Sequence, residues 1–260
     1  RRYSKGLFFQ LNYTYAKVMS DTAGDGQTSF EAFLDINNGK IEKSRTPFDQ
    51  THSLKGNAIY DLPFGKGMKF LSNAPSAVNY VIGGWSISGI YTFASGNPFS
   101  ILTERGTLNR DARSTGQNGN TATTLLNKSE LDNIFQLRMT GNGPYYVSAS
   151  AIGSDGRGVA ADGKAPFAGQ VFFNPGMATI GALQRRYFSG PNWWNLDFGV
   201  QKKILIGERQ SVEVRMESTN FFNHATFYMG DDNINSATFG RVNATQTAAR
   251  RFQFGLYYRF

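Results

Sequence analysis

The chain of 260 residues contains no cysteine, so it has neither a disulfide framework nor a thiolate metal site. It has only two histidines, His52 and His224, and neither fits the spacing of a two-histidine metal site or of a Ser-His-Asp triad. These residues carry no catalytic or metal-binding motif, and we expect a protein that is not an enzyme and that holds no resident cofactor.

Long hydrophobic runs are also missing. No segment approaches the roughly 20 apolar residues that a spanning helix needs, so only strands could carry this chain across a membrane. A secretory signal peptide is not visible, and the chain opens with Arg-Arg-Tyr-Ser-Lys-Gly and without Met. We interpret this opening as the start of a fragment or of a processed piece.

Basic residues outnumber acidic ones, but they do not cluster. The net charge is +8, and Lys and Arg are scattered rather than gathered into a basic stripe, so no nucleic-acid partner is expected. Aromatic residues and glycine are abundant, with 22 Phe, 12 Tyr and 29 Gly. This composition suits the interfacial girdles and tight turns of a membrane β-barrel, and it also suits a large soluble β-sandwich.

The last ten residues alternate strictly between two kinds of side chain. Large apolar side chains lie at Phe252, Phe254, Leu256, Tyr258 and Phe260, and the positions between them are Arg251, Gln253, Gly255, Tyr257 and Arg259. A period of two predicts a strand with one apolar and one polar face. Because arginine suits a water-filled interior, the pattern favours a membrane-barrel strand whose apolar face meets lipid.

Five earlier segments alternate in the same way: residues 6–17, 51–62, 81–94, 193–206 and 211–222. Long connections cover residues 19–47, 95–191 and 223–250, and short ones cover 63–79 and 207–209. Outer-membrane barrels alternate short periplasmic turns with long external loops in this manner. The sequence therefore predicts an all-β fold, about six strands of an antiparallel up-and-down transmembrane β-barrel, with residues 1–260 as one domain and residues 95–191 as a long extracellular loop.

Six strands are too few to close a barrel. Closed single-chain barrels start at about eight strands, and an open sheet would leave unpaired backbone groups in lipid. The remaining strands are therefore expected from a missing N-terminal region or from another chain.

The alternation assigns side chains to the two faces of this barrel wall. The predicted membrane-facing or girdle residues are Trp85, Tyr91, Trp194, Phe252, Phe254, Tyr258 and Phe260. The predicted lumen-facing polar residues are Asp197, Lys203, Glu213, Arg215, Glu217, Gln253 and Arg259. This lumen row is expected either to line a solute path or to form a structural ladder, in which Arg215 pairs with a carboxylate such as Asp197.

Other side chains near strand ends carry interfacial predictions. Lys202 interrupts the apolar row of its strand, and we expect it to snorkel to the interface. The aromatic pairs at residues 187–188, 193–194, 221–222 and 257–258 are predicted to form girdles.

The long loop contains one helical signal. Ser129-Glu-Leu-Asp132 resembles a capping box, and Leu131, Ile134, Phe135 and Met139 then recur at helical spacing. A short amphipathic helix over residues 129–139 is predicted.

Three loop motifs carry weak functional signals. Residues 158–164 fit the spelling of a phosphate loop, but Ala165 replaces the Ser or Thr that would hold Mg²⁺, and an ordinary glycine-rich loop is the simpler interpretation. Oxygen ligands for Ca²⁺ are available from Asp21, Asp25 and Glu31, or from Asp231 and Asp232, although their spacing does not fit an EF-hand and solvated loop charge is the simpler interpretation. Asn223 and His224 are expected to hold a loop by hydrogen bonds.

The last third of the chain carries a series of spaced motifs. Arg215-x-Glu217-x-x-Asn220-x-x-Asn223-His224 is followed by Ser236-Ala-Thr-Phe-Gly240-Arg241 and by an aromatic C-terminus, and Thr46-Pro-Phe-Asp49 and Phe173-Asn-Pro175 precede it. Together these motifs resemble the C-terminal barrel portion of TonB-dependent outer-membrane transporters of the Oar-like type.

The resemblance implies a barrel of about 22 strands around an internal plug, located in the bacterial outer membrane. Such a protein would bind and import a nutrient with energy from the inner membrane. The implied partners are outer-membrane lipid and a TonB-type energising complex, which is reached through a plug that this sequence lacks.

Two other interpretations remain open. The chain could be a soluble, secreted β-sandwich that binds glycans, with Trp85, Trp193 and Trp194 stacking on the ligand. It could also be a structural component that supplies six strands to a barrel completed by another chain.

Overall fold

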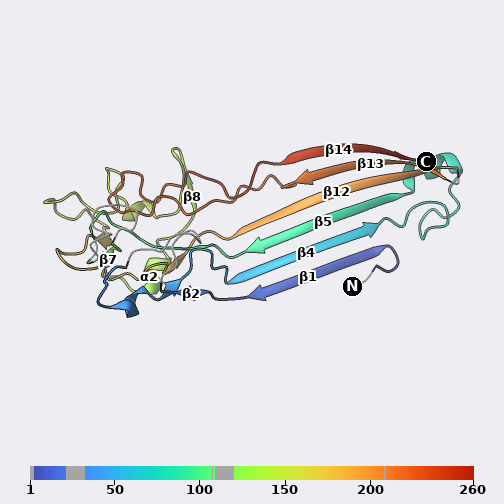
Figure 1. Cartoon of the computed structure of the whole chain (residues 1–260). Coiled ribbons are helices and arrows are strands. Elements are labelled where there is room, and N and C mark those ends of the chain that lie inside the picture. Colours follow the sequence, from blue (N-terminus) through green and yellow to red (C-terminus); the bar gives the residue numbers. More distant parts are fainter. Residues whose placement is uncertain (1–2, 22–32, 107, 109–119, 208) are drawn as a thin grey trace.

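A computed structural model describes residues 3–21, 33–106, 108, 120–207 and 209–260. Its largest element is an open sheet of six long strands, which extends from an irregular region formed by the long connections (Figure 1). The strands are β1 (Leu7–Tyr15), β4 (His52–Asp61), β5 (Trp85–Ala94), β12 (Trp193–Ile206), β13 (Gln210–Thr219) and β14 (Arg251–Arg259). Each pairs antiparallel with its neighbour in the order β1-β4-β5-β12-β13-β14, which confirms the predicted all-β, up-and-down arrangement.

The register of the sheet keeps the predicted apolar positions together from edge to edge. Phe9 lies opposite Ala58, Tyr60 opposite Ile87, Trp194 opposite Phe93 and Val214 opposite Leu256. Because side chains alternate along a strand, these pairs place the apolar rows of all six strands on one side of the sheet. We call this side the apolar face and the other side the polar face.

Among the described residues, no protein layer packs over the apolar face to form a core. Phe254 and Leu256 are 73% and 74% exposed, and the hydrophobic core of the described residues contains none from the six long strands. A β-sandwich buries such a face against a second sheet. The described residues do not form the second sheet that the soluble-sandwich interpretation requires.

The strand predicted over residues 81–94 begins four residues late. The preceding segment forms α1 (Ser76–Ile82), and β5 starts at Trp85 after a turn through Gly84, whose φ is +70°. A side chain at Gly84 would also collide with the backbone of Lys203. The apolar residues before Trp85 thus belong to a helix that alternation alone did not reveal. Over the described ranges, no helix is long and apolar enough to cross a membrane.

The helix predicted over residues 129–139 is much shorter. It is α2 (Lys128–Asp132), and its capping box uses Asn127 and Glu130 in place of Ser129 and Asp132. Leu131 is buried within the helix and Phe135 is buried beyond its end. The helical spacing of apolar residues therefore continues past the residue at which the helix ends.

The long connections fold into a compact unit with its own core. We call the described parts of residues 16–51, 95–192 and 220–250 the loop cap. Its four short strand pairs are β2 (Met19–Ser20) with β3 (Ser44–Arg45), β6 (Pro98–Phe99) with β11 (Phe188–Ser189), β7 (Thr123–Thr124) with β10 (Phe172–Phe173), and β8 (Arg138–Thr140) with β9 (Gly143–Tyr145). The described part of the loop cap also contains α2 and two 3₁₀ helices, η1 (Gly39–Glu42) and η3 (Ala149–Ala151).

Aromatic rings form the centre of the loop cap. The ring centroid of Phe135 lies 4.5 Å from that of Phe188 and 5.3 Å from that of Phe99, and Phe172 packs between Phe135 and Phe239. Phe188 is buried in this core, so the predicted girdle role of residues 187–188 is wrong for Phe188. Strand periodicity could not reveal this core, because its members come from short, irregular segments far apart in the sequence.

Candidate functional site

The predicted lumen row lies on the polar face of the sheet, where part of it forms an ion cluster. Glu213 is only 2% exposed; it pairs with Arg215 on the same strand and lies 3.4 Å from the Arg259 guanidinium on β14. Lys203 is opposite Glu213 in the register. The Arg215 guanidinium also lies 4.9 Å from the centre of the Tyr257 ring. Neighbouring groups thus satisfy a carboxylate that has little contact with solvent.

The predicted pair between Arg215 and Asp197 is wrong. Gln201 lies opposite Arg215 in the register, and Asp197 instead accepts hydrogen bonds from the side chain of Asn195 at 2.8 Å and from the backbone N–H of Asn220 at 2.9 Å. Asp197 therefore fixes the turn that follows β13. The last two predicted lumen residues, Glu217 and Gln253, lie opposite each other on the polar face.

The turn after β13 is held by the asparagines singled out in the sequence. Asn220 and Asn223 have positive φ values of 48° and 51°, a conformation that asparagine tolerates better than most residues. The Asn220 amide donates to the carbonyls of His224 and Ala248, and its oxygen accepts from the His224 N–H. The prediction that Asn223 and His224 hold a loop by hydrogen bonds is confirmed, and Asn220 is its centre.

Aromatic side chains gather at both ends of the apolar face. At the loop end, the Trp194 ring stacks on His224 at 4.3 Å and lies 6.4 Å from Tyr91, while the Tyr13 hydroxyl lies 2.8 Å from His52 Nδ1. At the other end, Trp85 lies opposite Lys202. Trp85 and Trp194 thus occupy opposite ends of the sheet and form no shared stacking platform.

Tyr258 and Phe260 lie at the end of β14, and their ring centroids are 6.0 Å apart. Phe252 lies at the other end of β14, opposite Ser218, with the Arg250 guanidinium 5.4 Å from its ring centre. The predicted girdle residues of the last strand are therefore spread over its whole length.

The prediction that Lys202 snorkels to the interface is wrong. It is buried, and its ammonium group donates to the carbonyls of Val81 and Gly83 while lying 5.2 Å from the centre of the Trp85 ring. The lysine therefore binds the last carbonyls of α1, which is where a cation stabilises a helix.

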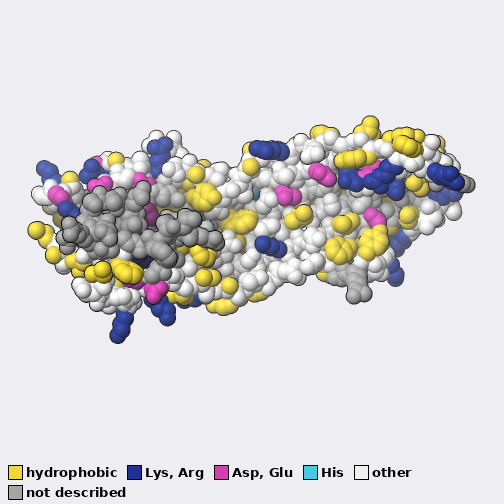
Figure 2. All heavy atoms as spheres, viewed as in Figure 1, with side chains coloured by type: hydrophobic (Ala, Val, Ile, Leu, Met, Phe, Trp, Pro, Cys, Tyr) yellow, Lys and Arg dark blue, Asp and Glu magenta, His cyan; other side chains and the backbone are white. Residues whose placement is uncertain are grey.

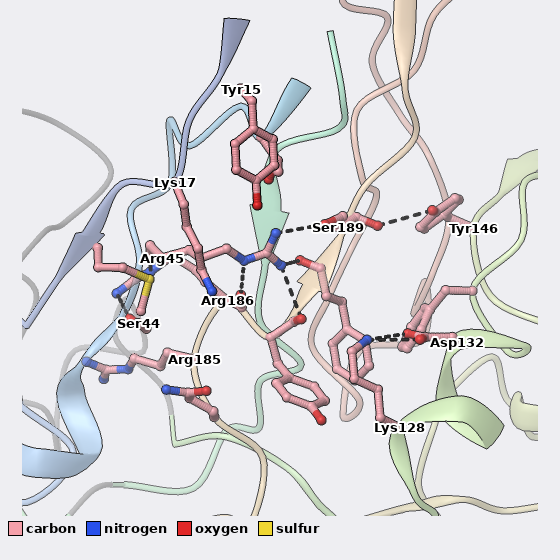
Figure 3. Close-up of a pocket in the computed structure, with 16 residues that line it drawn as sticks. Tyr15, Lys17, Ser44, Arg45, Lys128, Asp132, Tyr146, Arg185, Arg186 and Ser189 are labelled. Carbon is pink, nitrogen blue, oxygen red and sulfur yellow. Dashed lines mark hydrogen bonds and ion pairs between the residues drawn. The ribbon is translucent and has the colours of Figure 1, made fainter. Parts of the chain in front are cut away.

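A cavity of about 600 Å³ lies between the loop end of the sheet and the loop cap (Figure 3). Its lining includes five cationic residues, one carboxylate and several aromatic rings. The charged members are Lys17, Arg45, Lys128, Asp132, Arg185 and Arg186. Sequence reasoning missed this cavity, and the Arg185-Arg186 pair within an irregular segment was the available signal.

Hydrogen bonds between segments far apart in the sequence build the wall of this cavity. Arg45 donates to the carbonyls of residues 186, 187 and 188 and to the Ser189 hydroxyl. Burial lowers the pKa of Arg45, and the nearby charge of Asp49 partly offsets this effect. The Tyr146 hydroxyl donates to the Ser189 carbonyl at 3.2 Å, and burial, together with Asp132, raises its pKa.

Among the described residues, the phosphate-loop and Ca²⁺ predictions find no assembled site. Residues 158–164 lie between η3 and β10, with no strand leading in and no helix following over residues 152–171. The carboxylate of Asp231 accepts from the Asn233 N–H and the Thr238 hydroxyl, and Asp232 follows it in the same turn region. Asp21 is exposed, and Asp25 and Glu31 lie outside the described residues. Within the described ranges, no group of three or more His, Asp or Glu side chains could hold a metal ion.

One antiparallel sheet with an exposed apolar face, a charged opposite face and long connections at one end defines the wall of a membrane β-barrel. The family model of the outer membrane beta barrel domain matches residues 1–253, and the chain belongs to this family. The protein is accordingly located in the bacterial outer membrane. No match was found among curated proteins or among solved structures.

Proposed function

We propose that these six strands belong to a TonB-dependent transporter of the Oar-like type, which imports a nutrient across the outer membrane and carries out no enzymatic reaction. The observation that supports this proposal most is the separation of apolar and polar side chains, kept in register across all six strands. The apolar face meets lipid and the polar face lines a water-filled interior. The buried ion cluster at Glu213 then belongs to the inner wall.

The proposed barrel is larger than this sheet. β1 and β14 each have one neighbour among the described strands, and unpaired strand edges in lipid cost several kcal/mol for each unsatisfied group. Further strands therefore close the barrel, to about 22 in transporters that carry a plug. They come from another part of a longer protein or, in a structural-component alternative, from another chain. The plug would contact the energising complex.

The loop cap lies outside the cell in this arrangement, and its cavity captures the solute. The basic side chains that line it outnumber the single carboxylate of Asp132. Lys17 is exposed at this cavity, where its ammonium group is available to a ligand. A solute that carries an acidic group is therefore favoured.

Uptake by intact cells tests this function. We compare three kinds of cells: cells carrying the full-length protein, cells lacking it, and cells carrying it that are de-energised by a protonophore. Mass spectrometry measures which acidic solutes each of them removes from the growth medium. We expect one solute to remain in the medium when the protein is absent or the membrane is de-energised.

Charge reversal then tests the cavity. Lys17→Glu should slow uptake of that solute several-fold, whereas Lys164→Glu, on an exposed part of the loop cap away from the cavity, should not. Identical depletion of the medium with and without the protein would show that it does not import a solute.

A further inference from the structure

The connection between β4 and β5 (residues 62–84) is an exposed segment rich in apolar side chains. Contact between these side chains and water is unfavourable. It lies at the end of the sheet opposite the loop cap, beside the C-terminus (Figure 1). Its large apolar side chains are mostly exposed, with Leu71 at 60% and Val81 at 69%. The exposed members are Phe64, Met68, Phe70, Leu71, Val78, Tyr80 and Val81.

This connection is folded, so its apolar side chains are held at the surface. The rings of Phe64 and Phe70 are 5.5 Å apart, and the Phe70 N–H donates to the Pro63 carbonyl at 3.0 Å. The side chain of Asn79 in α1 accepts from the Lys66 N–H at 2.7 Å, which ties the helix to the preceding turn. These contacts therefore hold the apolar side chains of the connection in exposed positions.

The anchors of α1 show toward which face of the sheet it folds. The Trp85 indole N–H donates to the Val81 carbonyl at 2.8 Å, and the Lys202 ammonium group donates to the same carbonyl at 3.2 Å. Trp85 and Lys202 lie opposite each other on the apolar face. The end of the helix is therefore held on the side of the sheet that carries the exposed apolar side chains.

The charge of the connection favours one kind of surface. Residues 62–84 contain two lysines, Lys66 and Lys69, and no acidic residue. Both lysines are exposed, and the ammonium group of Lys69 lies 5.4 Å from the centre of the Phe70 ring. Figure 2 shows basic and hydrophobic side chains next to one another at this end of the molecule. Basic side chains beside apolar ones are the composition of segments that lie in an anionic headgroup layer.

We propose that the β4–β5 connection lies in the headgroup layer of the inner leaflet of the outer membrane and binds anionic phospholipid there. Val81, Leu71 and Tyr80 enter the boundary between headgroups and acyl chains, and Lys66 and Lys69 contact the phosphates. This inference rests on the proposed orientation of the apolar face toward lipid.

Fluorescence quenching in nanodiscs tests the position of the connection. The full-length protein is labelled at Val81→Cys or Leu71→Cys, and the controls are Phe254→Cys on the apolar face and Met177→Cys in the loop cap, where Met177 is 98% exposed. We expect headgroup spin labels to quench positions 71 and 81, and iodide to quench position 177. Iodide quenching at 71 and 81 with lipid protection at 254 overturns this inference alone, whereas iodide quenching at 254 as well overturns the proposed orientation.

Lipid selectivity tests the role of the lysines. The protein is placed in nanodiscs of phosphatidylcholine mixed with phosphatidylglycerol. Native mass spectrometry then measures the ratio of the two lipids that remain bound to the protein. We expect Lys66→Gln and Lys69→Gln each to lower the share of phosphatidylglycerol up to about fivefold, and Lys164→Gln to leave it unchanged. An unchanged ratio in the double variant, or a photo-crosslink from position 81 to a periplasmic protein in cells, overturns the proposal.

Discussion

At the scale of single residues, the polar face depends on charges that neighbours neutralise. Glu213 is buried between Arg215 and Arg259, whereas Glu217 is exposed on the same face of the same strand. The two carboxylates differ in burial and in ion pairing. Substituting each in turn therefore distinguishes the stability that the ion cluster contributes from the effect of removing a negative charge.

Glu213→Gln should lower the free energy of unfolding by about 1–3 kcal/mol, since it leaves two guanidinium groups without their carboxylate. The loss stays below that of a fully buried pair because Arg259 is more than half exposed. Urea unfolding of the full-length protein in lipid vesicles measures it. Glu217→Gln is the control and should change the free energy of unfolding by less than about 0.5 kcal/mol. Equal losses in the two variants would show that the ion cluster does not stabilise the protein.

Asn220 combines a left-handed backbone with a central place in the turn after β13. Asn220→Ala should cost about 2–4 kcal/mol, because it removes the side-chain hydrogen bonds and strains the backbone. Asn220→Gly removes the same bonds but tolerates the positive φ, so it should cost less. If the two variants unfold at the same denaturant concentration, backbone conformation contributes nothing at this position.

At the scale of elements, the loop cap and the sheet depend on different interactions. Phe135→Ala should cost about 3–5 kcal/mol within the aromatic core of the loop cap and should leave the strand pairing intact. Limited trypsin digestion of cells displaying the full-length protein should then cleave within residues 95–191, while the heat-dependent migration of the folded barrel on gels is unchanged. Leu137→Ala, in an exposed position of the same segment, should remain resistant.

The two kinds of element also differ in how well the sequence predicts them. The six strands and their two faces follow from alternation, because each residue's face depends only on its parity along the strand. β12 matches its predicted bounds, whereas α1 was hidden because its apolar residues run into those of β5. The loop-cap core and the basic cavity depend on contacts between distant irregular segments, such as Arg45 with residues 186–188, and no local pattern encodes such contacts.

At the scale of the whole molecule, the orientation of the sheet relative to the membrane can be tested directly. The chain has no cysteine, so a single substitution gives one labelling site within residues 1–260. Gln253→Cys on the polar face should react with a water-soluble maleimide, and Phe254→Cys and Leu256→Cys on the apolar face should react only with a lipid-soluble one. The opposite pattern would mean that the polar face meets lipid.

The core of the loop cap also bears on the order of assembly. β5 and β12 are adjacent in the sheet, although residues 95–192 separate them in the chain, and a flexible tether of that length opposes pairing by an entropy that grows with its length. A prefolded cap holds the two ends of the tether close together, so this strand pair can form as if its connection were short. Phe135→Ala should therefore slow insertion of the barrel into vesicles even at temperatures where the finished protein is stable.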